Sequence, residues 1–238
     1  IVLHLLTSLP LLLVSLFNFK TNFILRISGY PKLNFWRKIL WKFSSKKLVK
    51  ITCPTKDLIV QLKKLKIFPD EIIVYLPDAI INIRDFINQT KNNFEKNIES
   101  KKKYFISVGR LTKQKNFSYL IDEFYEFSKK NNEIDLLIFG DGEEKQSLQA
   151  LLKKKNLSQR VFLMGHSTQI YSYMKSADAF ILSSLWEEPG FVLIEAAMSN
   201  LFIISSDCPN GPKEFLENGK AGLLFEKNKK NALKEKLE

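Results

Sequence analysis

The chain has 238 residues, of which 45% are hydrophobic, and carries a formal net charge of +12. This length suits one large or two small domains, and this hydrophobic content excludes wholesale disorder. The two cysteines, Cys53 and Cys208, lie far apart in the sequence, which excludes a disulfide framework and a cysteine-rich zinc site and fits a reducing cytoplasm.

The excess positive charge is confined to the first part of the chain. Residues 1–103 carry 19 Lys and Arg against 7 Asp and Glu, whereas residues 104–238 carry 18 of each kind. A basic surface of this kind suits an anionic partner such as a lipid headgroup, a lipid diphosphate or a nucleic acid. A merely soluble, Lys-rich face explains the same composition equally well, so both interpretations stay open.

The first part of the chain predicts a parallel α/β domain, because short apolar strands alternate with helices. The expected strands cover residues 1–6, 22–27, 49–53 and 72–75, and the expected helices cover residues 9–17, 33–43 and 56–65. Residues 1–17 are apolar but interrupted by Pro10 and short for a membrane span, which needs about 20 residues; the end of a truncated span is the alternative. Because the chain begins at Ile1 and stops at Glu238 inside a Lys-rich helical pattern, we expect a fragment at both ends.

The helix expected over residues 33–43 has two interpretations. Its apolar residues recur at helical spacing, with cations between them, at Phe35, Trp36, Ile39, Leu40 and Phe43. In one interpretation this apolar face packs on the domain core. In the other, the helix forms a basic amphipathic surface that contacts an anionic membrane.

A polar stretch separates the two parts of the chain. Residues 85–103 are rich in Asn, Lys and Glu and show little apolar periodicity, so we predict a linker there. The expected organisation is therefore a partial N-terminal domain at residues 1–84, the linker, and a second domain at residues 104–238.

The second domain alternates strands and helices in the same way. Strands are expected at residues 104–108, 134–139, 161–164, 179–182, 201–205 and 223–225, and helices at 117–127, 143–155, 170–176, 191–198 and near 213–216. Asn116 is the expected N-cap of the first helix. Ligands of such sheets bind outside the carboxyl ends of the strands, so we expect the loops there to form one shared site.

Residues 183–195 are the stretch around which this site is organised. An apolar strand leads into a loop, and a helix begins near Gly190. A helix start presents free N–H groups and the positive end of a dipole, which suits a phosphate. Glu187 in the loop and Glu195 one turn into the helix would repel an anion, but carboxylates accept hydrogen bonds from a vicinal diol. A sugar nucleotide has both phosphates and hydroxyls, so it fits the whole stretch.

Glu187 and Glu195, with Gly190 between them, resemble the signature of retaining glycosyltransferases of the GT-B fold, family four (glycosyl transferases group 1). The likeness runs from about residue 104 to 225. Its other segments, in the family's order, are Val108-Gly109-Arg110-Leu111 with Lys115, Phe139-Gly140-Asp141-Gly142, Val161-Phe162-Leu163-Met164-Gly165, and Asp207-Cys208-Pro209-Asn210-Gly211. The resemblance implies an α/β protein with two Rossmann-like domains, the N-terminal one incomplete, and a nucleotide-sugar donor site in the second domain.

The resemblance also implies a role for each matching residue. Arg110, Lys115 and Glu187 are the catalytic candidates, because the cations stabilise the leaving diphosphate and Glu187 orients the transferred sugar. The residues implied to bind the rest of the donor are Gly109, Gly140, Phe162, Met164, Gly190, Phe191, Val192 and Glu195. Amides at the helix start take the diphosphate, Glu195 takes the ribose, and the backbone near Phe162 and Met164 faces the base.

Glycosyl transfer needs cations or dipoles at the leaving diphosphate. Many transferases use a metal held by an Asp-x-Asp pair, and this sequence contains no such pair. Arg110 offers a planar fork suited to phosphate, and Lys115 offers a point charge. We therefore predict no metal and no cofactor besides the nucleotide-sugar substrate.

Two departures from the family pattern concern the acceptor side. The first strands and the Gly-rich loop of the N-terminal domain are absent, and Ser28 stands where many members have a histidine. Serine cannot perform the proton chemistry of a histidine, so that role is not carried over to this chain.

The expected function is transfer, with retention, of a hexosyl or N-acetylhexosaminyl group from a UDP-sugar or similar donor to a glycan or lipid-linked acceptor in cell-surface polysaccharide synthesis. The alternative is an inactive nucleotide-sugar-binding fragment or partner subunit. A nicotinamide-dependent dehydrogenase would need a third glycine after Gly142, and a nucleic-acid partner would need a recognition motif, so neither is favoured. We expect a cytoplasmic protein in peripheral contact with the inner membrane face.

Overall fold

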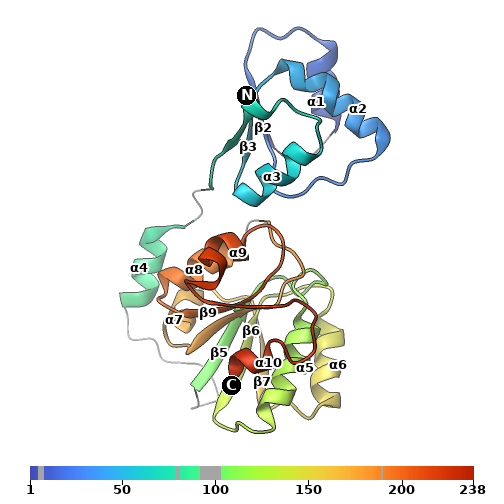
Figure 1. Cartoon of the computed structure of the whole chain (residues 1–238). Coiled ribbons are helices and arrows are strands. Elements are labelled where there is room, and N and C mark those ends of the chain that lie inside the picture. The colour runs from blue at the N-terminus through green and yellow to red at the C-terminus, as the bar shows by residue number, and fades with distance from the viewer. Residues whose placement is uncertain (5–7, 79–80, 92–102, 189) are drawn as a thin grey trace. The chain divides into compact units, whose positions relative to one another are not determined.

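The computed structural model describes all residues except 5–7, 79–80, 92–102 and 189. It divides into two compact units, residues 1–79 and residues 80–238 (Figure 1). The elements of the first unit are β1 (Val2–His4), α1 (Ser8–Leu16), β2 (Phe23–Arg26), α2 (Phe35–Ser44), β3 (Leu48–Cys53), α3 (Lys56–Lys64) and β4 (Ile73–Tyr75). The elements of the second unit are α4 (Ile83–Lys91), β5 (Lys103–Val108), α5 (Phe117–Ser128), β6 (Ile134–Phe139), α6 (Lys145–Lys154), β7 (Val161–Gly165), α7 (Ile170–Lys175), β8 (Ala179–Leu182), α8 (Phe191–Met198), β9 (Phe202–Ser206), α9 (Pro212–Phe215), β10 (Leu223–Phe225) and α10 (Lys234–Leu237).

The first unit has a parallel sheet in the order β1-β2-β3-β4. Leu3, Leu25, Ile51 and Ile73 lie side by side across the four strands, and all belong to or pack on the apolar cluster shared with α1, α2 and α3. Lys50, one position before Ile51, is exposed, because successive side chains of a strand point to opposite faces. The core of this unit therefore lies on the one face of the sheet that the three helices cover.

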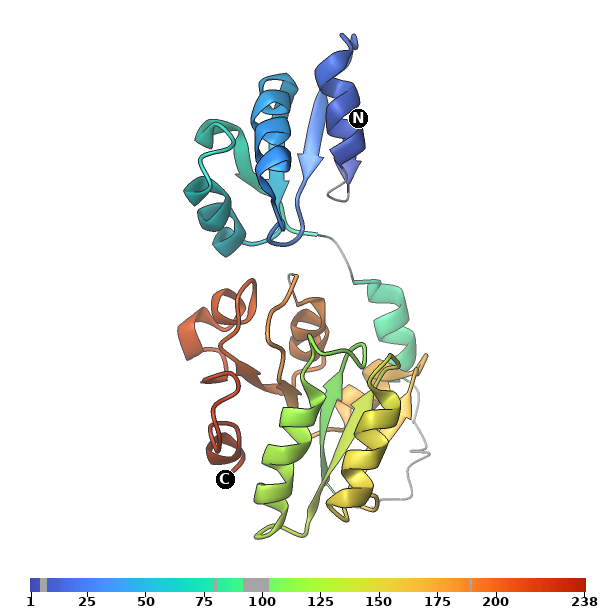
Figure 2. The ribbon, with the colours of Figure 1, turned by 90° about the vertical axis from the view of Figure 1, so that its right-hand side faces the viewer.

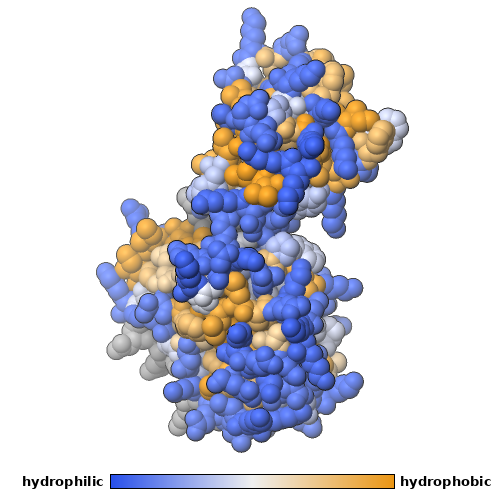
Figure 3. Space-filling view, in the orientation of Figure 1, coloured by the Kyte–Doolittle hydropathy of each residue, from blue (hydrophilic) through white to orange (hydrophobic). Residues whose placement is uncertain are grey.

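Helix α2 packs one face on that core and leaves other apolar side chains exposed. Its buried residues are Trp41 and Ser44, and Leu40 is half-buried against the cluster. The apolar side chains that α2 leaves exposed are Phe35, Trp36, Ile39 and Phe43. The interpretation of a helix with one face on the core is therefore confirmed through Trp41 and Leu40, and the exposed residues form a second apolar face. Figure 3 shows apolar residues gathered at the surface of this unit where α2 lies in Figure 1.

The second unit has a six-stranded parallel sheet in the order β10-β9-β8-β5-β6-β7 (Figure 2). From β5 the chain proceeds to β6 and β7 on one side, and later returns to β8, β9 and β10 on the other. The order reverses between the neighbours β5 and β8, which makes this a topological switch point of a doubly wound sheet. The Ser107 hydroxyl on β5 donates to the Ile181 carbonyl on β8 at 2.6 Å and ties these two strands together.

Both faces of this second sheet are buried. Along β6, Leu136 and Ile138 join the apolar cluster with α5, α6 and α10, whereas Leu137 and Phe139 join the cluster with α7 and α8. Helices on both faces are the rule for parallel sheets, and they explain why the strands are nearly continuous apolar runs. The loops at the carboxyl ends of these strands are thereby held on a rigid base. No helix in the described part of the chain is long and apolar enough to span a bilayer.

The structure corrects the linker expected at residues 85–103. Helix α4 occupies Ile83–Lys91 and belongs to the second unit, and the division between the units lies at residues 79 and 80 rather than at 84. The Phe86 ring packs edge-on against the Tyr171 ring of α7, with the ring centres 5.2 Å apart. Ile83, Phe86 and Ile87 recur at helical spacing, and the contact of Phe86 with α7 helps to stabilise this short helix. Residues 92–102 of the expected linker lie outside the described residues.

Asn116 occupies the expected N-cap position of α5, but its side chain does not cap the helix. Asn116 precedes α5 but has a left-handed backbone, with φ of 55°, and its side chain makes no capping hydrogen bond. Instead, its side-chain amide donates to the Asn228 side chain at 2.7 Å, which joins two loops far apart in the sequence. A cap needs an extended backbone for its side chain to reach the helix amides, and Asn116 lacks that conformation.

Candidate active site

Two loops meet at the switch point of the second unit, one after β5 and one after β8. The first carries Lys115 and the second carries Glu187. The Lys115 Nζ atom lies 2.7 Å from Glu187 Oε1, and the two side chains are only 13% and 4% exposed. Burial of a lone charge is costly, so the attraction between the two groups offsets the cost of their burial.

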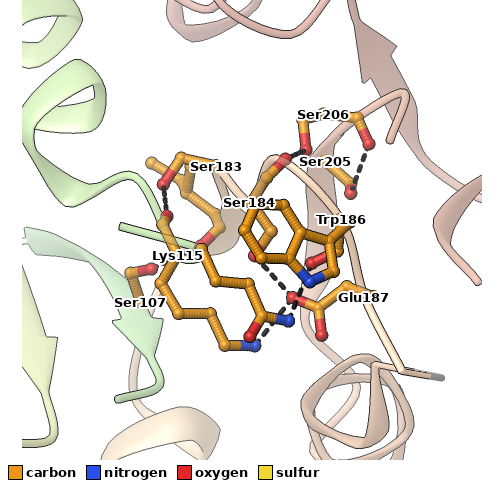
Figure 4. A network of polar contacts seen from close by, with 10 residues as sticks. Ser107, Lys115, Ser183, Ser184, Trp186, Glu187, Ser205 and Ser206 are labelled. Carbon is orange, nitrogen blue, oxygen red and sulfur yellow. Dashed lines mark hydrogen bonds and ion pairs between the residues drawn. The ribbon is translucent and has the colours of Figure 1, made fainter. Parts of the chain in front are cut away.

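Serine hydroxyls complete the surroundings of this ion pair (Figure 4). The Ser184 hydroxyl donates to the same Oε1 atom of Glu187. Ser206 on β9 donates to the Ser184 carbonyl at 2.6 Å, and Ser183 donates to the Lys115 carbonyl at 2.8 Å. The serines thus bind the loop of Glu187 both to β9 and to the loop of Lys115.

Backbone hydrogen bonds hold the loop after β8 in the same way. The Leu185 N–H donates to the Gln114 carbonyl at 2.8 Å, and the Gln114 side-chain amide donates to the Trp186 carbonyl at 3.0 Å. The Glu187 N–H donates to the Pro209 carbonyl at 3.0 Å. The Glu187 carboxylate is therefore preorganised, because its own backbone and its neighbours are bonded to two other loops.

Glycines let these loops approach one another closely. A Cβ at Gly109 would lie 3.0 Å from Lys115 Cε, so the Lys115 chain runs along this glycine. Gly140 has φ of +134°, and a Cβ there would lie 1.9 Å from the Gly109 carbonyl oxygen. Gly190 has φ of +81°, and a Cβ there would lie 3.3 Å from Glu187 Cγ. These three predicted residues therefore pack around the ion pair or against each other.

Helix α8 begins directly after Gly190 and so starts beside Glu187. The N–H groups of Phe191 and Val192 belong to its first turn, where no earlier carbonyl of the helix is available to them. They also lie at the positive end of the helix dipole. An anion bound there would lie near backbone N–H donors and the Lys115 cation.

Glu195 lies one turn further along α8 and is half-buried. The Tyr171 hydroxyl on α7 donates to Glu195 Oε1 at 3.3 Å. Burial raises the pKa of the Glu195 carboxyl, and the hydrogen bond from Tyr171 opposes that rise. Burial, and after it the charge of Glu195, raises the pKa of Tyr171, so the phenol keeps its proton and remains a donor.

Three predicted residues stand apart from this network. Arg110 lies in the loop after β5 and is exposed. Phe162 and Met164 lie on the edge strand β7 and are half-buried against the apolar cluster that α7 and α8 cover. The diphosphate contact of Arg110 and the base contacts of β7 stay predictions.

Sequence analysis missed Ser184, Ser206 and Tyr171. A signal was available for Ser184, because polar residues that directly follow a buried parallel strand lie at the ligand edge of the sheet. No sequence pattern pairs Tyr171 with Glu195. Their contact arises because α7 and α8 cover the same face of the sheet.

Among the described residues, no group of three or more His, Cys, Asp or Glu side chains is arranged to hold a metal ion. The absence of a metal requirement stays a prediction. Cys208 is buried close to the ion pair, and burial raises the pKa of its thiol to about 12. Because the thiolate is the reactive form, this cysteine is not a nucleophile candidate.

Comparison with known proteins identifies the family. The model of the family described as "Glycosyl transferases group 1" matches residues 88–238, which is more than half of the chain. The chain belongs to this family. A glycosyltransferase of Methanocaldococcus jannaschii, named as uncharacterized, is 38% identical over 153 residues, which cover 64% of this chain and 36% of that protein. The resemblance of the chain to glycosyl transferases group 1 is thereby confirmed.

Two further comparisons extend the likeness to the first unit of the chain. A Campylobacter jejuni enzyme, "N-acetylgalactosamine-N,N'-diacetylbacillosaminyl-diphospho-undecaprenol 4-alpha-N-acetylgalactosaminyltransferase", is 27% identical over 231 residues, which cover 93% of this chain and 61% of that enzyme. The crystal structure of Anabaena HepE in complex with UDP superposes with a TM-score of 0.77 at 15% identity, over 99% of this chain and 67% of HepE. The predicted α/β fold with two Rossmann-like units, the GT-B fold, is confirmed. The chain spans between about a third and two thirds of the lengths of these relatives.

Proposed function

We propose that this chain provides the donor site of a retaining glycosyltransferase. The enzyme moves a hexosyl or N-acetylhexosaminyl group from a UDP-sugar to a glycan or lipid-linked acceptor in cell-surface polysaccharide synthesis. The observation that carries the proposal is the buried ion pair of Lys115 and Glu187 beside the start of α8, at the switch point of a doubly wound sheet. Ligands of such sheets bind at that point.

The pair supplies the two kinds of group that a nucleotide sugar requires. Lys115 and the amides of Phe191 and Val192 stabilise the negative charge that grows on the leaving diphosphate. Glu187, held by Ser184, accepts hydrogen bonds from hydroxyls of the transferred sugar and fixes its orientation. Arg110, exposed in the same loop as Lys115, adds a second cation to the diphosphate.

The remaining donor contacts follow the same edge of the sheet. Glu195 accepts hydrogen bonds from the ribose hydroxyls. The backbone of β7 near Phe162 and Met164 faces the base, and Gly140 leaves room beside it. The UDP in the HepE structure supports uridine as the base, and the name of the Campylobacter jejuni enzyme supports a lipid-linked acceptor.

Calorimetric titration of the full chain with UDP, GDP and ADP tests the donor site. We expect UDP to bind best, with the same dissociation constant in EDTA. Glu195→Ala should weaken UDP binding about 10- to 100-fold, because hydrogen bonds to a charged group are lost. Glu188→Ala is the control, since Glu188 is an exposed carboxylate of the loop that precedes α8 and its loss should leave the affinity unchanged. A folded chain that binds none of the three diphosphates would contradict the proposal.

The acceptor side of the proposal includes peripheral contact with an anionic membrane on the cytoplasmic side. Phe35 and Trp36 on α2 are 69% and 75% exposed, and Ile39 and Phe43 continue the same apolar stripe at helical spacing. The lysines of α2, Lys38 and Lys42, are exposed beside the stripe, and Lys46 follows directly after the helix. Exposed aromatic residues flanked by lysines suit the interface of a membrane that contains anionic lipids.

Vesicle co-sedimentation tests this membrane contact. We expect binding to phosphatidylglycerol vesicles, weakened by salt, and little binding to phosphatidylcholine vesicles. The double variant Phe35→Ser/Trp36→Ser should weaken binding by about tenfold or more, because two exposed rings no longer enter the interface. Val60→Ser, on the exposed side of α3, is the control and should bind like the unchanged chain. Equal binding by all three proteins would rule out α2 as the contact.

A further inference from the structure

Tyr171 links the candidate donor site to helix α4, which precedes the second sheet. The Tyr171 side chain is buried between α4 and α8, and its hydroxyl donates to Glu195 Oε1 at 3.3 Å. This distance is long for an O–H···O hydrogen bond, as hydrogen bonds of catalytic sites often are before the ligand binds. The bond occupies one carboxylate oxygen and leaves Oε2 to accept from a ligand.

Helix α4 holds the segment of Tyr171 by one ring contact and three hydrogen bonds. The Phe86 ring packs against the Tyr171 ring. The Gln89 side chain accepts from the Tyr171 N–H at 3.2 Å, and the Gln89 carbonyl accepts from the Ser172 hydroxyl at 2.6 Å. Lys175 at the end of α7 donates to the carbonyl of Thr90 at 3.1 Å. These contacts leave the Tyr171 ring little freedom to turn away from Glu195.

We infer that Tyr171 is a positioning residue, which orients the Glu195 carboxylate toward the ribose and is itself held in place by α4. The inference rests on the proposed function, since it takes the ribose contact of Glu195 from there. A carboxylate with one oxygen fixed loses less conformational freedom when its other oxygen meets a diol, so the affinity for the ribose rises. The hydroxyl also opposes the effect of burial on the Glu195 pKa and so favours the charged, accepting form.

The variant Tyr171→Phe isolates the hydroxyl, because the ring and its packing on Phe86 are kept. The full chain is titrated with UDP and with 2′,3′-dideoxy-UDP, which lacks the diol that Glu195 is proposed to hold. We expect Tyr171→Phe to weaken UDP binding about tenfold and to leave dideoxy-UDP binding unchanged. Gln89→Ala should also weaken UDP binding, by a smaller factor. Tyr119→Phe is the control, since it removes a hydroxyl that donates to the Lys229 carbonyl elsewhere in the unit.

The outcomes separate the inference from the function on which it rests. If Glu195→Ala abolishes the preference for UDP over dideoxy-UDP and Tyr171→Phe keeps it, the ribose contact stands and the positioning role of Tyr171 is wrong. If Tyr171→Phe lost affinity equally for both ligands, this result would also contradict the inference, because it would indicate general damage to the unit. If the unchanged chain binds UDP and dideoxy-UDP equally, the ribose contact itself fails, and the inference fails with it.

Discussion

Replacement of Lys115 by Met is expected to lower the rate of sugar transfer about 100- to 1,000-fold. Lys115 is a half-buried cation beside the start of α8, where the diphosphate is proposed to bind, and its side chain is paired with the buried Glu187. Met keeps the apolar stem that lies along Gly109 and removes only the charge. The loss should appear in kcat more than in KM, because the negative charge of the leaving diphosphate grows toward the transition state. The measurement is the initial rate of UDP release from a UDP-sugar donor.

The same substitution is expected to destabilise the fold, and a second substitution separates the two effects. Lys115→Met leaves Glu187 as a buried carboxylate without its cation, which should lower the free energy of unfolding by about 3–5 kcal/mol. The double variant Lys115→Met/Glu187→Gln removes the lone charge and keeps an acceptor for the Ser184 hydroxyl. It should recover most of the stability in urea unfolding and none of the activity.

Lys113→Met is the matched control for the loss of a cation from this loop. Lys113 is exposed, so its substitution should change neither the rate nor the stability appreciably. If the double variant were as active as the unchanged chain, Lys115 would be a structural partner of Glu187 and not a catalytic residue. If Lys113→Met were as inactive as Lys115→Met, the loss would reflect the net charge of the loop rather than the buried pair.

Local sequence patterns were sufficient for the elements of the sheets. The strands over residues 134–139 and 179–182 and the helix over 191–198 have the bounds expected from apolar runs and helical periodicity. The edge at which the loops gather also followed from the sequence, because parallel strands bring their carboxyl ends together. That rule placed Lys115 and Glu187 at one edge, although 72 positions separate them.

Features that depend on contacts between distant segments could not be predicted in this way. Helix α4 is short and mostly polar, and the sequence does not show that Phe86 and Gln89 hold it against α7. Asparagine is a residue type that favours helix N-caps, yet Asn116 has a left-handed backbone and its side chain contacts Asn228 instead. The hydrogen bond from Tyr171 to Glu195 likewise depends on how two helices cover one face of a sheet.

Substitution of Gly140 by Ala is expected to destabilise the second unit by about 3–5 kcal/mol. The new Cβ would lie 1.9 Å from the Gly109 carbonyl oxygen, which is backbone and cannot rotate away as a side chain could. The ends of β5, β6 and β7 are tied at this point, because the Gly109 N–H donates to the Phe139 carbonyl at 2.9 Å and the Gly140 N–H donates to the Gly165 carbonyl at 2.8 Å. A shift large enough to admit the methyl group would break these hydrogen bonds and move the loop that carries Lys115.

Gly165→Ala provides the matched control for this prediction. Gly165 also has a positive φ, of +71°, but a Cβ there would meet nothing within 4 Å. Its substitution should therefore cost only the strain of the left-handed backbone, about 1–2 kcal/mol. Urea unfolding gives the two losses, and hydrogen exchange in β5 and β6 shows whether the Gly140 variant opens at the loop or throughout the sheet. Equal losses in the two variants would mean that backbone strain alone matters, and that the close contact of Gly140 with Gly109 does not hold Lys115 in place.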